Sequence, residues 1–124
     1  MSRLALLVFL ALPASLLSAP GEQIRMTEPR PQSTSYIGQD VSGRWVGVIP
    51  NDGYRIVVMF IEVGTTPPVV TEVEATLDMM NGTWWATIPN DLNINKEYHI
   101  SAALYNGQQN CGSDAVLFVT IEGT

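Results

Sequence analysis

Two adjacent tryptophans, Trp84 and Trp85, are the residues of this sequence best suited to binding chemistry. They lie in a run of strand-forming residues, and successive side chains of a β-strand point to opposite faces of its sheet. We therefore expect one indole to enter the core and the other to be exposed. An exposed indole can stack on a sugar ring or on a partner side chain, and Tyr105 or Tyr54 could lie near it. The candidate binding residues are Trp84, Trp85 and Tyr105; the alternative is an indole that only covers a sheet edge or packs under a loop.

Residue types that commonly carry catalysis are few and scattered. Cys111 is the only cysteine and His99 the only histidine, and nothing in the sequence places the two together. Glu72 and Glu74 fall on one face of a predicted strand, where a carboxylate pair is more often solvated than an acid and base or a cation site. The sequence therefore predicts no catalytic residues, no metal site, no cofactor and no enzyme. Cys111 is left with a structural role or with an intermolecular disulfide.

Asn81-Gly82-Thr83 matches the acceptor sequence for N-glycosylation, which suits an exposed turn of a secreted protein. Asn-Gly is also the preferred pair of a tight hairpin turn. The sequence leaves both interpretations open, and Asn81 is the glycosylation candidate.

Residues 1–21 have the features of a secretory signal peptide. Arg3 precedes an apolar run over residues 4–12, and small residues follow up to Ala19-Pro20-Gly21. The run is shorter than the ~20 apolar residues that a membrane span requires. We expect cleavage near Gly21, with Ser18 or Ala19 as alternative sites, and hence a secreted protein without a stable membrane span. A retained amphipathic anchor is the alternative.

Residues 22–124 have the length of one domain. They keep all twelve acidic residues of the chain but only five cations, since Arg3 lies in the predicted signal peptide. Such an acidic surface repels phosphate backbones, which argues against nucleic-acid binding. The acids are spread along the chain, as expected for solubility outside the cell.

Apolar and β-branched runs separated by turn residues predict an all-β domain of about seven strands. The run over residues 54–63 is apolar enough to predict a central strand covered on both faces. Residues 28–38 are rich in turn formers and predict an irregular connection, and residues 107–114 predict a hairpin loop. The expected strands cover residues 24–27, 41–49, 54–63, 69–77, the tryptophan run, 97–105 and 115–121.

A leucine and a tyrosine six residues apart, Leu92 and Tyr98, indicate how the strands are joined. In immunoglobulin-like sandwiches a buried tyrosine near the start of a strand returns its hydroxyl to backbone a few residues upstream. We therefore expect an antiparallel immunoglobulin-like or fibronectin III-like sandwich. The expected core is Trp45, Ile56, Val58, Phe60, Leu77, one of the two tryptophans, Leu92, Tyr98, Ile100, Leu104 and Phe118.

Two family resemblances follow from these residues. The stretch from Arg44-Trp45 through Asn51-Asp52-Gly53 to Leu92 and Tyr98-His99-Ile100 resembles a fibronectin type III domain. A wider set is similar to the N-terminal domain of fungal Ser/Thr-rich, GPI-anchored cell-wall proteins of the yeast β-glucan-synthesis type. That set comprises Pro29, Ser33, Gly38, Trp45, Asn81 to Trp85, Ile88-Pro89, Asp91-Leu92, Tyr98, Ile100 and residues 113–121.

The second resemblance implies a secreted, non-catalytic β-sandwich associated with the cell wall and with β-1,6-glucan assembly. The Ser/Thr-rich tail and hydrophobic GPI signal of that family do not occur in this sequence, which argues against covalent wall attachment. We expect a binding or structural module of the extracellular matrix or cell wall whose partner is an extracellular polysaccharide or protein. The alternative is a small secreted inhibitor or effector that binds one protein.

Overall fold

The computed structural model describes residues 24–46 and 53–123, which form nine β-strands and no helix. The predicted all-β class is confirmed, whereas the predicted signal peptide lies outside the described residues. No described segment is a helix that is long and apolar enough to cross a membrane. The strands are β1 (Ile24–Glu28), β2 (Thr34–Tyr36), β3 (Asp40–Trp45), β4 (Tyr54–Glu62), β5 (Val70–Glu74), β6 (Thr76–Asp78), β7 (Thr83–Thr87), β8 (Lys96–Asn106) and β9 (Gln109–Glu122).

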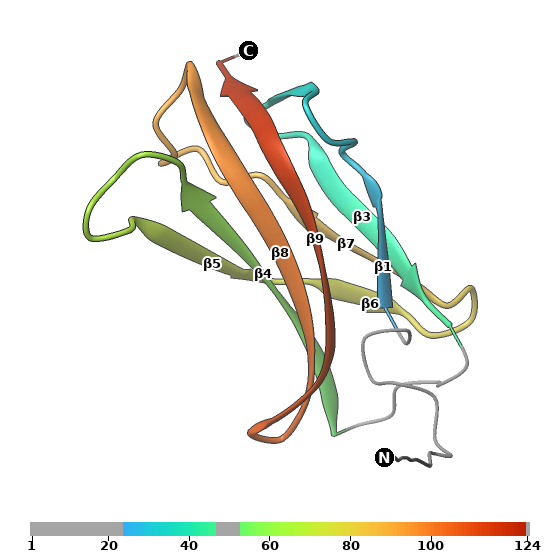
Figure 1. Ribbon diagram of the computed structural model, residues 1–124. Coiled ribbons are helices and arrows are strands. Elements are labelled where there is room, and N and C mark those ends of the chain that lie inside the picture. Colours follow the sequence, from blue (N-terminus) through green and yellow to red (C-terminus); the bar gives the residue numbers. More distant parts are fainter. Residues whose placement is uncertain (1–23, 47–52, 124) are drawn as a thin grey trace, which may run out of the picture.

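The nine strands form two sheets that face each other (Figure 1). A four-stranded sheet has the order β1-β3-β7-β6, and a five-stranded sheet has the order β2-β9-β8-β4-β5. All neighbours are antiparallel except β2 and β9, which are parallel. Period-two alternation in strands such as β3 and β7 sends one set of side chains inward from each sheet. These inward residues meet in a single hydrophobic core.

The core contains most of the residues that the sequence predicts for it. Trp84, Tyr98 and Phe60 are the largest fully buried side chains. Leu77 is partly buried and packs against the core. The remaining confirmed members are Trp45, Ile56, Val58, Leu92, Ile100 and Leu104.

Phe118 is a correction, because its side chain is 40% exposed. The pairing of β8 with β9 shifts between Tyr98 and Ile100, so that Leu117 and Phe118 together oppose His99. Such a bulge breaks the period-two alternation from which a core position is inferred. Phe118 has a φ of 59° at this point, and its ring lies edge-on to the His99 imidazole on the outside of the sheet, with centroids 5.0 Å apart.

The structure has two strands more than the sequence predicts, for two reasons. Strand β2 forms in the segment predicted to be irregular, because it pairs with the distant β9. The single strand predicted over residues 69–77 is divided at Ala75, whose N–H donates to the Ile56 carbonyl oxygen at 2.8 Å before the chain crosses to the other sheet. As a result β5 and β6 are edge strands of different sheets.

The last hairpin is tighter than predicted. The sequence predicts a loop over residues 107–114, but Asn106 pairs with Gln109 and β9 begins there. Only Gly107 and Gln108 make the turn, where Gly107 has a φ of 64° that glycine accepts readily. Of the strand predicted over residues 41–49, β3 covers the part up to Trp45, and residues 47–49 lie outside the described residues.

Candidate binding site

Trp84 and Trp85 point to opposite faces of β7, as their adjacency predicts. Trp84 is 0% exposed and belongs to the core, whereas Trp85 is 39% exposed on the outer face of the four-stranded sheet. Trp84 therefore has no surface for a ligand, and Trp85 is the tryptophan that remains a candidate binding residue.

Gly43 explains why Trp84 occupies the core position. The two residues are cross-strand partners in β3 and β7. A Cβ atom at Gly43 would lie 2.5 Å from Cζ2 of Trp84 and would also clash with the Arg25 carbonyl oxygen. The large indole fits because its partner has no side chain. With Trp84 held inward, Trp85 must face outward.

Polar side chains surround Trp85 on the outer face of its sheet. Its direct cross-strand partners are Ser42 on β3 and Thr76 on β6, and Cβ atoms of such partners lie ~5 Å apart. Two further rows of paired residues run across the strands on either side of the row that holds Trp85. One row contains Arg25, Arg44, Thr83 and Asp78, and the other contains Asp40 and Thr87. We call this surface the Trp85 face: Ser42, Arg44, Thr76, Asp78, Thr83, Trp85, Thr87, Asp40, Arg25 and Glu28.

Hydrogen bonds hold some of these polar groups in place. The Thr87 hydroxyl donates to Oδ1 of Asp40 at 3.2 Å, and the Thr27 hydroxyl donates to the Ser42 carbonyl oxygen at 3.2 Å. The surface thus offers one flat aromatic ring among hydroxyls, carboxylates and guanidinium groups. A sugar has the matching chemistry, since it presents an apolar C–H face to an indole and a rim of hydroxyls to polar side chains.

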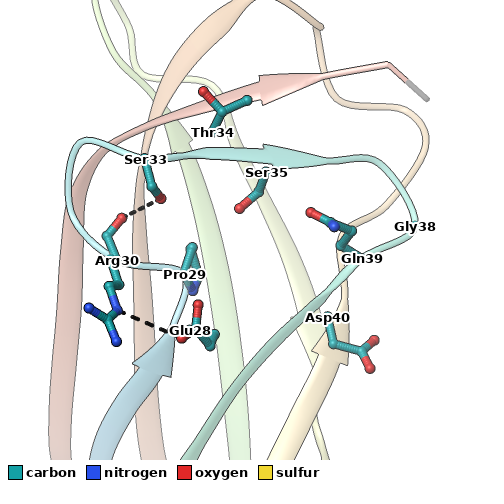
Figure 2. Close-up of a pocket in the computed structure, with 9 residues that line it drawn as sticks. All are labelled: Glu28, Pro29, Arg30, Ser33, Thr34, Ser35, Gly38, Gln39 and Asp40. Atoms are coloured by element: carbon teal, nitrogen blue, oxygen red, sulfur yellow. Dashed lines mark hydrogen bonds and ion pairs between the residues drawn. The ribbon is translucent and has the colours of Figure 1, made fainter.

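A polar hollow of about 530 Å³ continues the Trp85 face where β1 leaves its sheet (Figure 2). It lies between the connection from β1 to β2 and the start of β3. Nε of Arg30 lies 3.9 Å from Oε2 of Glu28. The Arg30 carbonyl oxygen accepts a hydrogen bond from the Ser33 hydroxyl at 2.6 Å. We call it the β1–β2 hollow; it is lined by Glu28, Pro29, Arg30, Ser33, Thr34, Ser35, Gly38, Gln39 and Asp40.

Tyr105 does not join Trp85, which corrects the prediction of one surface containing both. Tyr105 lies on β8 in the five-stranded sheet, where the Arg55 guanidinium sits 5.2 Å from the centre of its ring. The outer faces of the two sheets are on opposite sides of the molecule (Figure 1). Tyr54 is half-buried and packs against the core, so neither tyrosine is near the exposed indole.

The residues considered for catalysis also stay apart. Cys111, partly buried against the core, is near the Tyr105 end of β8. It lies six residues along β9, ~20 Å, from Leu117, which opposes His99. Glu72 and Glu74 share the outer face of β5, as predicted. Among residues 24–46 and 53–123, no three His, Cys, Asp or Glu side chains form a group able to hold a metal ion. The intermolecular disulfide through Cys111 stays a prediction.

Asn81 lies in the exposed turn that joins β6 to β7. Its Nδ2 donates to Oδ2 of Asp78 at 2.8 Å, and Gly82 has a φ of 69°. Hydrogen bonds from the Asn81 side chain and backbone lower the pKa of Asp78. The turn chemistry is therefore present, and the exposed side chain remains accessible for a glycan.

The other side of the molecule carries apolar side chains that the sequence did not predict to be exposed. Strand β4 was predicted to be covered on both faces, but Met59 and Ile61 on its outer face are only half-buried. No other described element lies over them (Figure 1). Exposed Val70 lies beside Ile61 on the neighbouring β5, and exposed Leu117 and Phe118 lie on β9, with His99 of β8 between them and Ile61. The run of consecutive apolar residues over 56–61 was the available signal.

Comparison of the chain with protein-family models and with curated proteins finds no match. The two family resemblances of the sequence therefore stay predictions, and the Trp85 face and the β1–β2 hollow are the features that point to a function.

Proposed function

We propose that this protein is a secreted, non-catalytic module that binds an extracellular polysaccharide of the matrix or cell wall through the Trp85 face. The observation that carries the proposal is the position of Trp85. An indole that is 39% exposed in the middle of a polar sheet keeps apolar surface in water, and a ligand that stacks on it removes that surface. The neighbouring hydroxyls and charged groups are placed to bind the hydroxyls of the same ligand.

The proposed fold type is an immunoglobulin-like or fibronectin III-like sandwich. The strand orders support it, because β1-β3-β7-β6 corresponds to the A-B-E-D sheet of an immunoglobulin-like domain and β9-β8-β4 to its G-F-C sheet. In this scheme β2 is an additional strand next to G, and β5 an additional strand next to C.

Secretion and a cell-wall location complete the proposal. The signal-peptide pattern over residues 1–21 supports secretion, and the resemblance to fungal cell-wall proteins supports the location. N-terminal sequencing of protein collected from culture medium tests the first of these: the chain should begin close to Gly21, and a chain that begins at Met1 would contradict secretion by cleavage.

A second candidate function, a small secreted inhibitor or effector that binds a protein, is favoured by a different surface. Val70, Leu117 and Phe118 are exposed on the outer face of the five-stranded sheet, and Met59 and Ile61 are half-buried there, so this face carries apolar side chains beside the Glu72 and Glu74 carboxylates. Surfaces of this kind often take part in protein association.

Sedimentation with an insoluble glucan separates the two candidates. The polysaccharide module should sediment with the glucan and be released by soluble glucose oligomers. A protein that stays in the supernatant at low and moderate salt, while a protein partner co-purifies with it from the medium, would favour the inhibitor or effector.

A further inference from the structure

We infer that the β1–β2 hollow is a second sugar subsite, which binds one uncharged sugar residue of the same chain that stacks on Trp85. The inference rests on the proposed function and names the ligand more closely: a neutral glycan that spans at least two sugars. The hollow has a volume of about 530 Å³, which falls within the ~300–1,000 Å³ typical of small-molecule sites.

The strongest observation in the hollow is Ser35. This residue is only 7% exposed, and its side chain points into the space enclosed by the β1–β2 connection (Figure 2). Its hydroxyl has no hydrogen-bond partner among the described residues. The hydroxyl is open to solvent in the hollow, where a ligand hydroxyl can replace water as its hydrogen-bond partner.

Gln39 and Asp40 supply the complementary donors and acceptors. Oε1 of Gln39 accepts from the Tyr36 backbone N–H at 2.8 Å, which fixes the amide and leaves its nitrogen to donate. Oδ1 of Asp40 accepts from the Thr87 hydroxyl at 3.2 Å, which leaves Oδ2 to accept. A serine hydroxyl, an amide donor and a carboxylate acceptor suit neighbouring hydroxyls of one sugar ring.

The hollow and the Trp85 face are continuous. Asp40 pairs with Thr87, which lies two residues along β7 from Trp85. Glu28 pairs with Ser42, and Ser42 pairs directly with Trp85. Glu28 is therefore two strand spacings from Trp85, ~10 Å across the sheet. This separation makes two distinct subsites rather than one.

Charge decides which glycans fit. The hollow holds the carboxylates of Glu28 and Asp40 against the single guanidinium of Arg30, and the whole chain has a formal net charge of −6. A uronate or a sulfated sugar would be repelled from this site. An uncharged sugar meets no such cost.

A titration followed by nuclear magnetic resonance tests the inference. The probes are neutral glucose oligomers of increasing length, and the readouts are the indole N–H of Trp85 and the backbone amides of Ser35 and Gln39. We expect all three signals to shift, and affinity to rise with oligomer length. Ser35→Ala removes one hydrogen bond to the ligand and should weaken binding roughly three- to tenfold. Ser113→Ala, on the exposed outer face of the five-stranded sheet and away from the hollow, is the matched control and should leave affinity unchanged.

The outcomes separate this inference from the proposed function. Shifts at Trp85 alone, with unchanged affinity in Ser35→Ala, would overturn the hollow as a subsite and leave the Trp85 face intact. Shifts at Ser35 and Gln39 alone would support the hollow and overturn stacking on Trp85. The absence of shifts at either place would overturn both, and equal binding of uronate oligomers would overturn the preference for neutral sugars.

Discussion

The phenolic oxygen of Tyr98 lies 2.9 Å from the backbone nitrogen of Asn93, which donates a hydrogen bond to it. The same hydroxyl is 3.2 Å from the Asn93 carbonyl oxygen and 3.5 Å from Oε1 of Glu62, both of them acceptors. The Tyr98 ring is buried, and so is Leu92. The tyrosine thus ties the segment ahead of β8 to the core, which confirms the corner predicted from the spacing of Leu92 and Tyr98.

Removing this hydroxyl should destabilise the fold. We expect Tyr98→Phe to lower the free energy of unfolding by about 1–3 kcal/mol, because the Asn93 N–H loses its acceptor in a partly buried position. Urea denaturation measures the change. Tyr36→Phe is the control, since Tyr36 is 42% exposed and its hydroxyl has no partner among the described residues. Equal midpoints for the two variants would show that the corner hydrogen bonds contribute nothing to stability.

Tyr98 should also make the protein sensitive to alkaline pH. Burial raises the pKa of Tyr98 above its ordinary value of 10.0, so the folded state favours the neutral phenol more than the unfolded state does. This contribution to stability is complete below pH 10 and is lost as pH rises through the higher pKa of the folded state. Unfolding free energies measured from pH 8 upward should therefore fall less steeply for Tyr98→Phe than for the parent. The same pH dependence of the unfolding free energy in both proteins would contradict a raised pKa for Tyr98.

The close approach of Gly43 to Trp84 gives a third prediction. Gly43→Ala should destabilise the protein by about 1–3 kcal/mol, because the new methyl group overlaps the indole ring and the Arg25 carbonyl oxygen. Gly43 does not have a positive φ, so its backbone conformation suits alanine. The stability change therefore reports the overlap of the new methyl group with its neighbours. Ser42→Ala, on the outward side of the same strand, is the control. If the indole causes part of the cost, Gly43→Ala should be less harmful in a Trp84→Leu background; equal costs in the two backgrounds would contradict the account.

Glycosylation of Asn81 is the fourth prediction. Asn81 is exposed in a turn, and we expect protein secreted from a eukaryotic host to lose the mass of one glycan on treatment with an N-glycosidase. Thr83→Val should abolish the glycan while it keeps Asn81 and its hydrogen bond to Asp78. An unchanged mass for the parent would mean that Asn81 serves the turn alone.

Local patterns explain which parts of the structure could be predicted from the sequence. The alternation around Trp45, the adjacency of Trp84 and Trp85, and the spacing of Leu92 and Tyr98 each depend on neighbours along the chain. They correctly predict the all-β class, most of the core and the exposed indole. The tryptophans also show a limit of prediction from local sequence. Their adjacency requires one buried and one exposed ring, but the long-range pairing of Trp84 with Gly43 decides which of the two is buried.

Long-range pairing explains what was missed. Strand β2 has little strand signal of its own and forms beside β9, more than eighty residues later. The bulge that exposes Phe118 is a property of the β8–β9 register rather than of either strand. Residue type alone suggests that Tyr105 and Trp85 share a surface, but the division of strands between two sheets separates them. The β1–β2 hollow depends on the same division, because it forms where the chain changes sheets.

The two tryptophans should separate stability from binding. We expect Trp84→Ala to destabilise the protein by about 3–5 kcal/mol, as is typical when a large buried aromatic side chain is removed. Trp85→Ala should change stability by less than about 1 kcal/mol, because its side chain is partly exposed and fills no core space. Thermal or urea unfolding checks both values. Similar losses in both variants would show that the Trp85 ring is a packing residue.

The most direct test of the polysaccharide-binding proposal is the retention of Trp85→Ala on an insoluble glucan, compared with the parent and with Tyr105→Ala. Tyr105 provides a matched aromatic control on the outer face of the opposite sheet. We expect the parent and Tyr105→Ala to be retained to the same extent, and folded Trp85→Ala to remain in the supernatant. Retention of Trp85→Ala equal to that of the parent would contradict the claim that the Trp85 face binds polysaccharide.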